Sequence, residues 1–221
     1  MRDDVLRRYA ALAVPRYTSF PTAADFTTQT PDTMRRWLRQ IGPAEHVSLY
    51  IHVPYCREIC HYCGCHAKMA IREDVIANYV AALLSEIDTV GAALSARPKV
   101  VHLHWGGGTP SILSEQQFKA VVTALQLAFE FDPAMEHAIE LDPRTVTPQL
   151  VQTLAHIGVN RASLGVQDID EKVQKAIGRI QPFETVRRAT DLLREVGISR
   201  INFDLIYGLP YQTVETIRST C

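Results

Sequence analysis

The sequence predicts an α/β protein built around a parallel sheet. Runs of apolar and β-branched residues recur along the chain, and segments with apolar residues at helical spacing separate them. Five strands that alternate with helices indicate parallel βαβ units. Each unusual polar phrase of the sequence also follows the carboxyl end of an expected strand, where ligands bind in such folds. These observations together predict one composite site at that edge of the sheet.

The first predicted unit is a strand, a loop and a long helix. Residues 47–53 form an apolar, β-branched run, which is typical of a buried strand. Residues 74–94 place apolar side chains three and four positions apart, so a long amphipathic helix is expected there. A shorter helix is expected at 31–41, where Gly42 ends it. We therefore expect an N-terminal extension over residues 1–45, partly irregular and partly helical, and a core over 46–221.

Four further units repeat this pattern. The expected strands are 100–104, 137–141, 161–166 and 201–206. The expected helices are 114–129, 147–157, one from about 170, and 182–196. Ser114 with Gln117 predicts a capping box for the first of these helices, and Pro148 and Gly158 mark the two ends of the second. Residues 214–217 begin another helix, so the fifth unit is expected to be cut short.

Composition and charge exclude several classes of protein. The chain has 221 residues, is 47% hydrophobic, and has 23 Lys+Arg against 24 Asp+Glu, so no basic field indicates nucleic-acid binding. The N-terminus carries charge where a signal peptide needs an apolar segment, and no run approaches the roughly 18 apolar residues of a membrane span. We therefore expect a cytoplasmic protein without a membrane span, most simply a monomer.

Four of the five cysteines crowd into YIHVPYCREICHYCGCH, residues 50–66. In a reducing compartment clustered thiols are more often metal ligands than disulfides. The spacing of Cys56, Cys60 and Cys63 offers three thiolates to one iron–sulfur cubane, which leaves one iron open to a substrate or cofactor. Cys65 is left outside this set because its spacing from Cys63 would crowd the ligands.

From the sequence alone a zinc site is an alternative. It would combine three of the cysteines with His61 or His66. Zinc sites favour separated C-x-x-C pairs, which this loop does not have. The glycines of GGGTP, residues 106–110, are also open to a simpler interpretation, since Gly106–Gly108 could serve only a tight turn.

The cysteine spacing, with Tyr62 before the third cysteine, and GGGTP after the second strand resemble the radical S-adenosylmethionine superfamily. The resemblance implies an incomplete parallel (β/α)6-type barrel of which about five βα units are present. It also implies a 4Fe–4S cluster held by Cys56, Cys60 and Cys63. In that superfamily the amino and carboxylate groups of S-adenosylmethionine chelate the open iron.

The resemblance narrows when further phrases are added. PRYTSFPTA, HWGGGTP, ELDPR, SLGVQD and NFDLIYGLPYQT occur in this order and are similar to the oxygen-independent coproporphyrinogen III oxidase family. This implies oxidative decarboxylation of two propionates of coproporphyrinogen III to vinyl groups, giving protoporphyrinogen IX in haem biosynthesis. The implied partners are that substrate and a reduced flavodoxin- or ferredoxin-type electron donor. Cys65 and the N-terminal phrase separate this family from related haem chaperones.

The same resemblance implies two S-adenosylmethionine molecules. The matching residues for the first are Tyr50, Gly107 and Glu140, and those for the second are Tyr62, Gly108, Thr109, Gln167, Arg179 and Asp204. Glu140 and Asp204 lie in strand phrases, where a carboxylate is costly unless it is paired. Internal salt bridges with Arg144, Arg161 or Arg179 are the alternative role for these two carboxylates.

Three other functions stay open from the sequence. They are a haem-binding chaperone of the same superfamily, a zinc-stabilised binding module, and another radical enzyme such as a methyltransferase. The family's C-terminal helical region has no counterpart here, which leaves the activity of this chain by itself open.

Several conspicuous residues receive simpler interpretations. His52, His102 and His104 are expected to be core histidines rather than catalytic ones. Trp105 suits either adenine stacking or core packing. Cys221 is expected to have no function.

Overall fold

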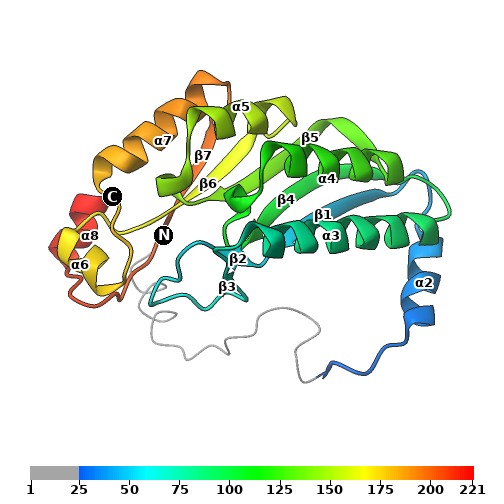
Figure 1. The fold of residues 1–221 in the computed structure, drawn as a ribbon, viewed down its shortest axis with the longest axis horizontal. Helices are drawn as coiled ribbons and strands as arrows, with labels where there is room; N and C mark the ends of the chain where they lie inside the picture. The colour runs from blue at the N-terminus through cyan, green and yellow to red at the C-terminus, as the bar shows by residue number, and fades with distance from the viewer. Residues whose placement is uncertain (1–24) are drawn as a thin grey trace, which may run out of the picture. The chain divides into compact units, whose positions relative to one another are not determined.

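Five parallel strands organise the chain from Leu38 onward (Figure 1). The strands are β1 (His46–Val53), β4 (Lys99–Gly107), β5 (Glu130–Leu141), β6 (Arg161–Gln167) and β7 (Arg200–Leu205). Every neighbouring pair is parallel, and the strands lie in the sheet in the order in which they occur in the chain. The structure, a computed structural model, describes residues 25–221, so PRYTSFPTA lies outside the described residues. The predicted α/β class is confirmed.

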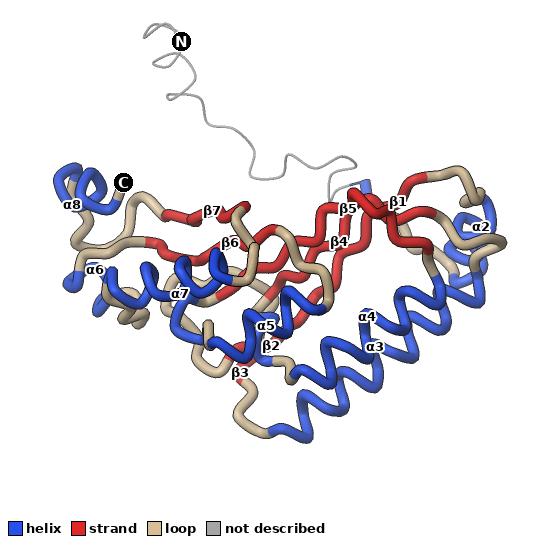
Figure 2. The backbone as a smooth tube through the Cα atoms, turned by 90° about the horizontal axis from the view of Figure 1, so that it is seen from above, coloured by secondary structure: helices blue, strands red, loops and turns tan. Residues whose placement is uncertain are grey.

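The crossover helices lie on one side of the sheet, as Figure 2 shows. They are α3 (Glu73–Ala93), α4 (Glu115–Ala128), α5 (Pro148–His156) and α7 (Phe183–Glu195), while α2 (Pro31–Gln40), α6 (Glu171–Ala176) and α8 (Val214–Thr220) are the other described α-helices. Parallel strands joined by crossovers of one hand place their helices on the same side. We call the opposite side of the sheet its open face.

The core lies between the sheet and these helices. Trp105 and Phe118 are completely buried and meet edge to face, with ring centroids 5.2 Å apart. The indole Nε1 of Trp105 donates to Nε2 of the equally buried His137 at 2.8 Å. Core packing is therefore the role of Trp105, and adenine stacking by it is excluded.

The predicted core position of three histidines is wrong. Ile51, Leu103 and Trp105 point into the helical layer, and side chains alternate along a strand. His52, His102 and His104 are exposed or half-buried because they point to the open face. The sequence pattern of these strands alternates polar and apolar residues, which is the signal that the sequence interpretation overlooked.

Two strands extend further than predicted. β4 continues through Gly106 and Gly107, which pair with His52 and Val53 of β1. β5 begins at Glu130 because its early residues pair with β4 from Lys99 onward. Hydrogen bonds to parallel neighbours outweigh the low strand propensity of glycine here.

Helix α3 is apolar and long enough, by length and composition, to cross a membrane, which the sequence interpretation did not recognise. Its buried residues Ile76, Val80 and Ile87 belong to the same core as the sheet. The exposed Glu86 and Asp88 flank this buried side next to Ile87. The three buried residues pack one side of the helix against the sheet.

Candidate functional site

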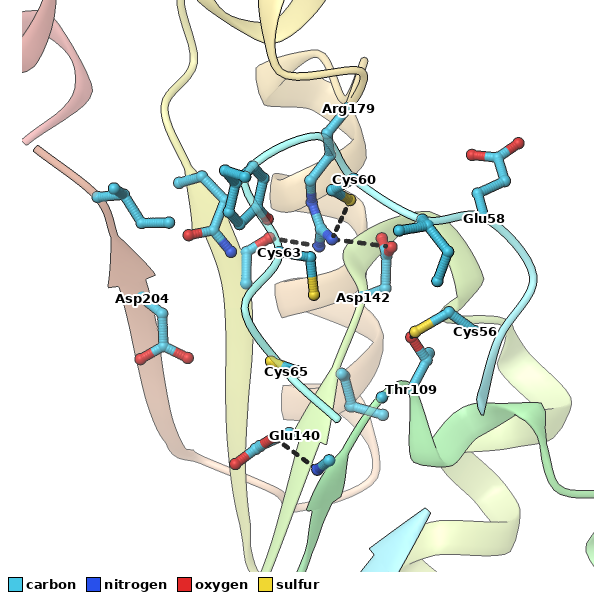
Figure 3. Close-up of a pocket in the computed structure, with 18 of the residues that line it drawn as sticks. Cys56, Glu58, Cys60, Cys63, Cys65, Thr109, Glu140, Asp142, Arg179 and Asp204 are labelled. Atoms are coloured by element: carbon cyan, nitrogen blue, oxygen red, sulfur yellow. Dashed lines mark hydrogen bonds and ion pairs between the residues drawn. The ribbon is translucent and has the colours of Figure 1, made fainter. Parts of the chain in front are cut away.

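A cavity of about 390 Å³ lies at the carboxyl edge of the sheet (Figure 3). The cysteine loop, defined as residues 54–72, forms one wall, and the ends of β4 to β7 form the others. Of the residues predicted for the site, the cavity is lined by Cys56, Cys60, Cys63, Tyr62, Gly107, Gly108, Thr109, Glu140, Gln167, Arg179 and Asp204. The structure thus brings together residues from six separate parts of the sequence.

Tyr50 is the predicted site residue that does not line this cavity. It lies on the open face of β1, where its hydroxyl contacts Nδ1 of His52 at 3.2 Å. Its hydroxyl and the carboxylate of Glu140 both approach the space above Gly106. Burial and the nearby charge of Glu140 raise the pKa of Tyr50, so the phenol stays protonated at neutral pH.

Contacts at the base and at the tip hold the cysteine loop in place. A short parallel pair, β2 (Tyr55–Cys56) with β3 (Lys68–Met69), closes its base. The sequence pattern did not predict this pair because two residues carry no periodicity. At the tip, the backbone N–H of His61 donates to the carbonyl of Ile177 at 3.0 Å, and His61 Nδ1 lies 3.2 Å from the carbonyl of Ala176.

The thiols of the loop have different surroundings. Cys60 is buried and Cys65 is exposed, with Cys56 and Cys63 between them. The hydroxyl of Thr109 donates to Cys56 Sγ at 3.2 Å, and a guanidinium nitrogen of Arg179 lies 3.6 Å from Cys60 Sγ. Burial raises the pKa of the Cys56 thiol, and the neighbouring cysteines add to the shift. Metal binding would therefore displace a proton from Cys56.

The donor set fits a cluster better than a single ion. Among residues 25–221, no group of three or more His, Cys, Asp or Glu side chains is arranged to hold one metal ion. A structural zinc site needs four ligands around one atom. A 4Fe–4S cluster spreads its thiolates over different irons, and three thiols around one cavity match that requirement.

The glycines of GGGTP are required by close contacts. A Cβ at Gly106 would lie 2.8 Å from Glu140 Oε1, and one at Gly108 would lie 2.6 Å from the carbonyl oxygen of Tyr55. Gly107 also has a positive φ of 111°. The interpretation of these residues as only a tight turn is wrong, because they let the cysteine loop and Glu140 approach the end of β4.

The partners of the two strand carboxylates differ from those predicted. Glu140 Oε1 lies 3.0 Å from His104 Nε2, and its Oε2 accepts the backbone N–H of Gly107 at 3.3 Å. Asp204 accepts hydrogen bonds from Ser163 at 2.7 Å and Asn202 at 2.8 Å. In the described structure neither carboxylate forms an ion pair with the arginines named as alternatives.

Those arginines pair with other carboxylates. The buried Asp142 contacts Arg144 at 2.8 Å and Arg179 at 3.3 Å, and Arg144 also reaches Glu58 at 2.9 Å. The Asp142 carboxylate raises the pKa of the Arg144 guanidinium further above its usual value, which keeps it charged. Asp142 lies in ELDPR, one of the phrases that carry the family resemblance, but it is not among the predicted site residues.

Gln167 occupies an unusual backbone conformation. Its φ is 67°, a region that non-glycine residues rarely adopt, and it follows a register shift between β6 and β7. Its carbonyl accepts the N–H of Ile206 at 3.1 Å. Such strain at the edge of a cavity is typical of functional sites.

A parallel sheet that brings three thiols and a glycine-rich strand end to one cavity defines an α/β protein with an iron–sulfur type of cofactor site. The model of the radical SAM superfamily matches residues 50–221. The chain belongs to this superfamily, whose members use a 4Fe–4S cluster together with S-adenosylmethionine.

Within this superfamily, the chain is similar to several oxygen-independent coproporphyrinogen III oxidases. An oxygen-independent coproporphyrinogen III oxidase from Bradyrhizobium diazoefficiens is 48% identical over 221 residues, and one from Paracoccus denitrificans is 41% identical over 200 residues. These alignments cover 100% and 90% of this chain but 49% and 44% of the relatives. The solved coproporphyrinogen III oxidase from Escherichia coli, described as a radical SAM enzyme, has a TM-score of 0.88 and 34% identity over 100% of this chain and 49% of its own. The chain thus spans about half the length of the curated relatives it matches.

Proposed function

We propose that a protein containing this chain is an oxygen-independent coproporphyrinogen III oxidase that converts two propionates of coproporphyrinogen III to vinyl groups. The single observation that carries the proposal is the cavity where three thiols face the glycine-rich end of β4 and two strand carboxylates. The relatives named above support the choice of reaction within the superfamily.

The residues around the cavity have separate roles in this proposal. Cys56, Cys60 and Cys63 would hold a 4Fe–4S cluster, and Glu140 and Asp204 would accept hydrogen bonds from S-adenosylmethionine. When bound, the cluster and S-adenosylmethionine supply the one-electron chemistry that removes hydrogen from the propionate β-carbon. Loss of carbon dioxide, with transfer of one further electron to a one-electron acceptor, would then leave the vinyl group.

Two S-adenosylmethionine molecules are part of the proposal. The first would contact Tyr50, Gly107 and Glu140; the second would contact the remaining predicted residues, namely Tyr62, Gly108, Thr109, Gln167, Arg179 and Asp204. Support comes from the cavity, which all of these residues except Tyr50 line. We also propose a cytoplasmic monomer reduced by a flavodoxin- or ferredoxin-type donor.

The cluster ligands are tested by removing one thiol at a time. After anaerobic reconstitution, Cys56→Ala, Cys60→Ala and Cys63→Ala are each expected to lose the brown 4Fe–4S chromophore and most bound iron, because three thiolates hold the cluster. Cys65→Ala and Cys221→Ala are matched controls that should keep it. Iron and sulfide analysis with visible absorption measures the outcome; a normal cluster in any of the first three variants would reject the ligand assignment.

The reaction is tested with a protein that contains this chain. It is incubated anaerobically with coproporphyrinogen III, S-adenosylmethionine and a reductant. The expected products are protoporphyrinogen IX, carbon dioxide and 5'-deoxyadenosine. Formation of 5'-deoxyadenosine without protoporphyrinogen IX would retain the superfamily and reject the oxidase. Haem binding without turnover would instead favour a chaperone.

A further inference from the structure

His104 stands between two residues proposed to bind the first S-adenosylmethionine. It lies on β4 directly beside Tyr50 of β1, because the two are partners in the strand register. Its partner on β5 is Ala138, and Glu140 lies two residues further along the same face. His104 is not among the residues assigned to the proposed site, so its contacts require a separate explanation.

The contacts of His104 reach both neighbours. Its ring stacks on Tyr50 with centroids 5.7 Å apart and an angle of 18° between the planes. Its Nε2 lies 3.0 Å from Glu140 Oε1. An ionised carboxylate only accepts hydrogen bonds, so Nε2 of His104 carries a hydrogen and donates a hydrogen bond to Glu140.

The other oxygen of Glu140 is also occupied. Its Oε2 accepts the backbone N–H of Gly107 at 3.3 Å, a contact drawn in Figure 3. Two donors from β4 therefore fix the plane of the carboxylate. Each carboxylate oxygen has a second lone pair, so Glu140 can still accept hydrogen bonds from a ligand.

We propose that His104 is a positioning residue whose hydrogen bond holds Glu140, beside Tyr50, in the arrangement that binds S-adenosylmethionine. This rests on the proposed function, because that function places the ligand on these two residues. A carboxylate fixed in advance loses less conformational freedom on binding, and this makes binding tighter. His104 acts through Glu140 and is not itself a catalytic residue.

Two substitutions of His104 separate its two contacts, and a third, at His102, is the control. His104→Phe keeps a ring against Tyr50 but removes the donor to Glu140. His104→Gln restores an N–H donor, because its amide nitrogen lies as many bonds from the backbone as Nε2. His102→Phe is the matched control, since His102 lies on the same face of β4 and contacts Ser48 Oγ at 3.2 Å.

Binding of S-adenosylmethionine to the anaerobically reconstituted chain, measured by equilibrium dialysis, gives the readout. We expect His104→Phe to bind about tenfold more weakly, since a charge-assisted hydrogen bond is lost. His104→Gln should recover most of the affinity, and His102→Phe should match the unmodified chain. Cluster content and melting temperature should be the same in all four proteins.

If His104→Phe and the unmodified chain bind S-adenosylmethionine with equal affinity, the inference about His104 is overturned, while the proposed function is not affected. Equal loss in the Phe and Gln variants would also overturn it, because the lost donor would then not be the cause. An unmodified chain that carries the cluster but does not bind S-adenosylmethionine would reject the proposed function itself. In a double-mutant cycle with Glu140→Gln, the two losses should be less than additive, and full additivity would show that His104 does not act through Glu140.

Discussion

Gly178 supports the tip of the cysteine loop through its missing side chain. It has a φ of 68°, and a Cβ there would lie between 2.9 and 3.1 Å from atoms of the His61 ring. Gly197 has a similar φ of 88°, but a Cβ there would meet nothing within 4 Å. The two glycines therefore share the same backbone demand and differ in one contact.

Gly178→Ala should lower the melting temperature more than Gly197→Ala. Both variants carry the backbone cost of an L-residue in the left-handed region, about 1 kcal/mol. Only Gly178→Ala also displaces His61, so faster hydrogen exchange in the cysteine loop is expected for it alone. Equal melting temperatures and equal exchange would show that the His61 contact does not support the loop.

His137 makes the stability of the protein depend on pH. Burial lowers its pKa to about 4, against an ordinary value near 6.5. The fold therefore favours the neutral ring. Its contribution to the free energy of unfolding is fully present above about pH 6.5 and is lost as the pH falls toward 4. The difference corresponds to about 3 kcal/mol as an upper bound.

His137→Gln removes this titration while keeping an acceptor for Trp105. The free energy of unfolding, measured with urea between pH 4 and 7, should vary less steeply for His137→Gln than for the unmodified protein. His156→Gln, at an exposed position outside the core, serves as the substitution control. A slope unaffected by His137→Gln would contradict the buried neutral ring.

At the scale of single elements, two helices begin with the same motif but differ in burial. Ser114 and Gln117 form a reciprocal capping box at the start of α4, and Thr213 with Thr216 forms one at the start of α8. α4 buries four residues in the core, whereas α8 has no buried residue.

Ser114→Ala should lower the free energy of unfolding by about 1 kcal/mol, because a backbone N–H of α4 loses its acceptor. Thr213→Ala should leave global unfolding almost unchanged and increase hydrogen exchange in α8 only. Chemical denaturation and exchange measurements distinguish the two. Equal global effects would show that α8 unfolds together with the core.

The order and type of the elements could be predicted because their signals are local. The Ser114 capping box and the apolar spacing of α3 both depend on residues that are close in sequence. The continuation of β4 through Gly106 and Gly107 could not be predicted, because it depends on pairing with β1. The same is true of the site. The spacing of the cysteines predicts their convergence, but the contact of His104 with Glu140 arises only when neighbouring strands align.

At the scale of the whole molecule, Asp142 joins three loops that are distant in sequence. Its buried carboxylate contacts Arg144 of its own loop and Arg179 from the loop before α7, and Arg144 continues to Glu58 of the cysteine loop. Figure 3 shows Asp142 and Arg179 beside Cys60 at the centre of this arrangement.

Asp142→Asn should cost about 3 kcal/mol of folding free energy, since two guanidinium groups lose their buried counter-charge. Glu58→Gln removes the exposed end of the same network and should cost less than about 1 kcal/mol. Urea unfolding of both variants measures the difference. A cost for Asp142→Asn as small as that for Glu58→Gln would mean that the network does not hold the loops together.

The contact of His61 with Ala176 spans 115 positions of the chain. During synthesis on the ribosome the cysteines therefore emerge well before the segment that supports the tip of their loop. Until that segment has emerged and packed, the thiols are expected to be accessible to oxidants and stray metal ions. Loading of the correct cofactor is then expected to follow translation of the fourth strand and its helix, which makes the order of synthesis part of how the site is assembled.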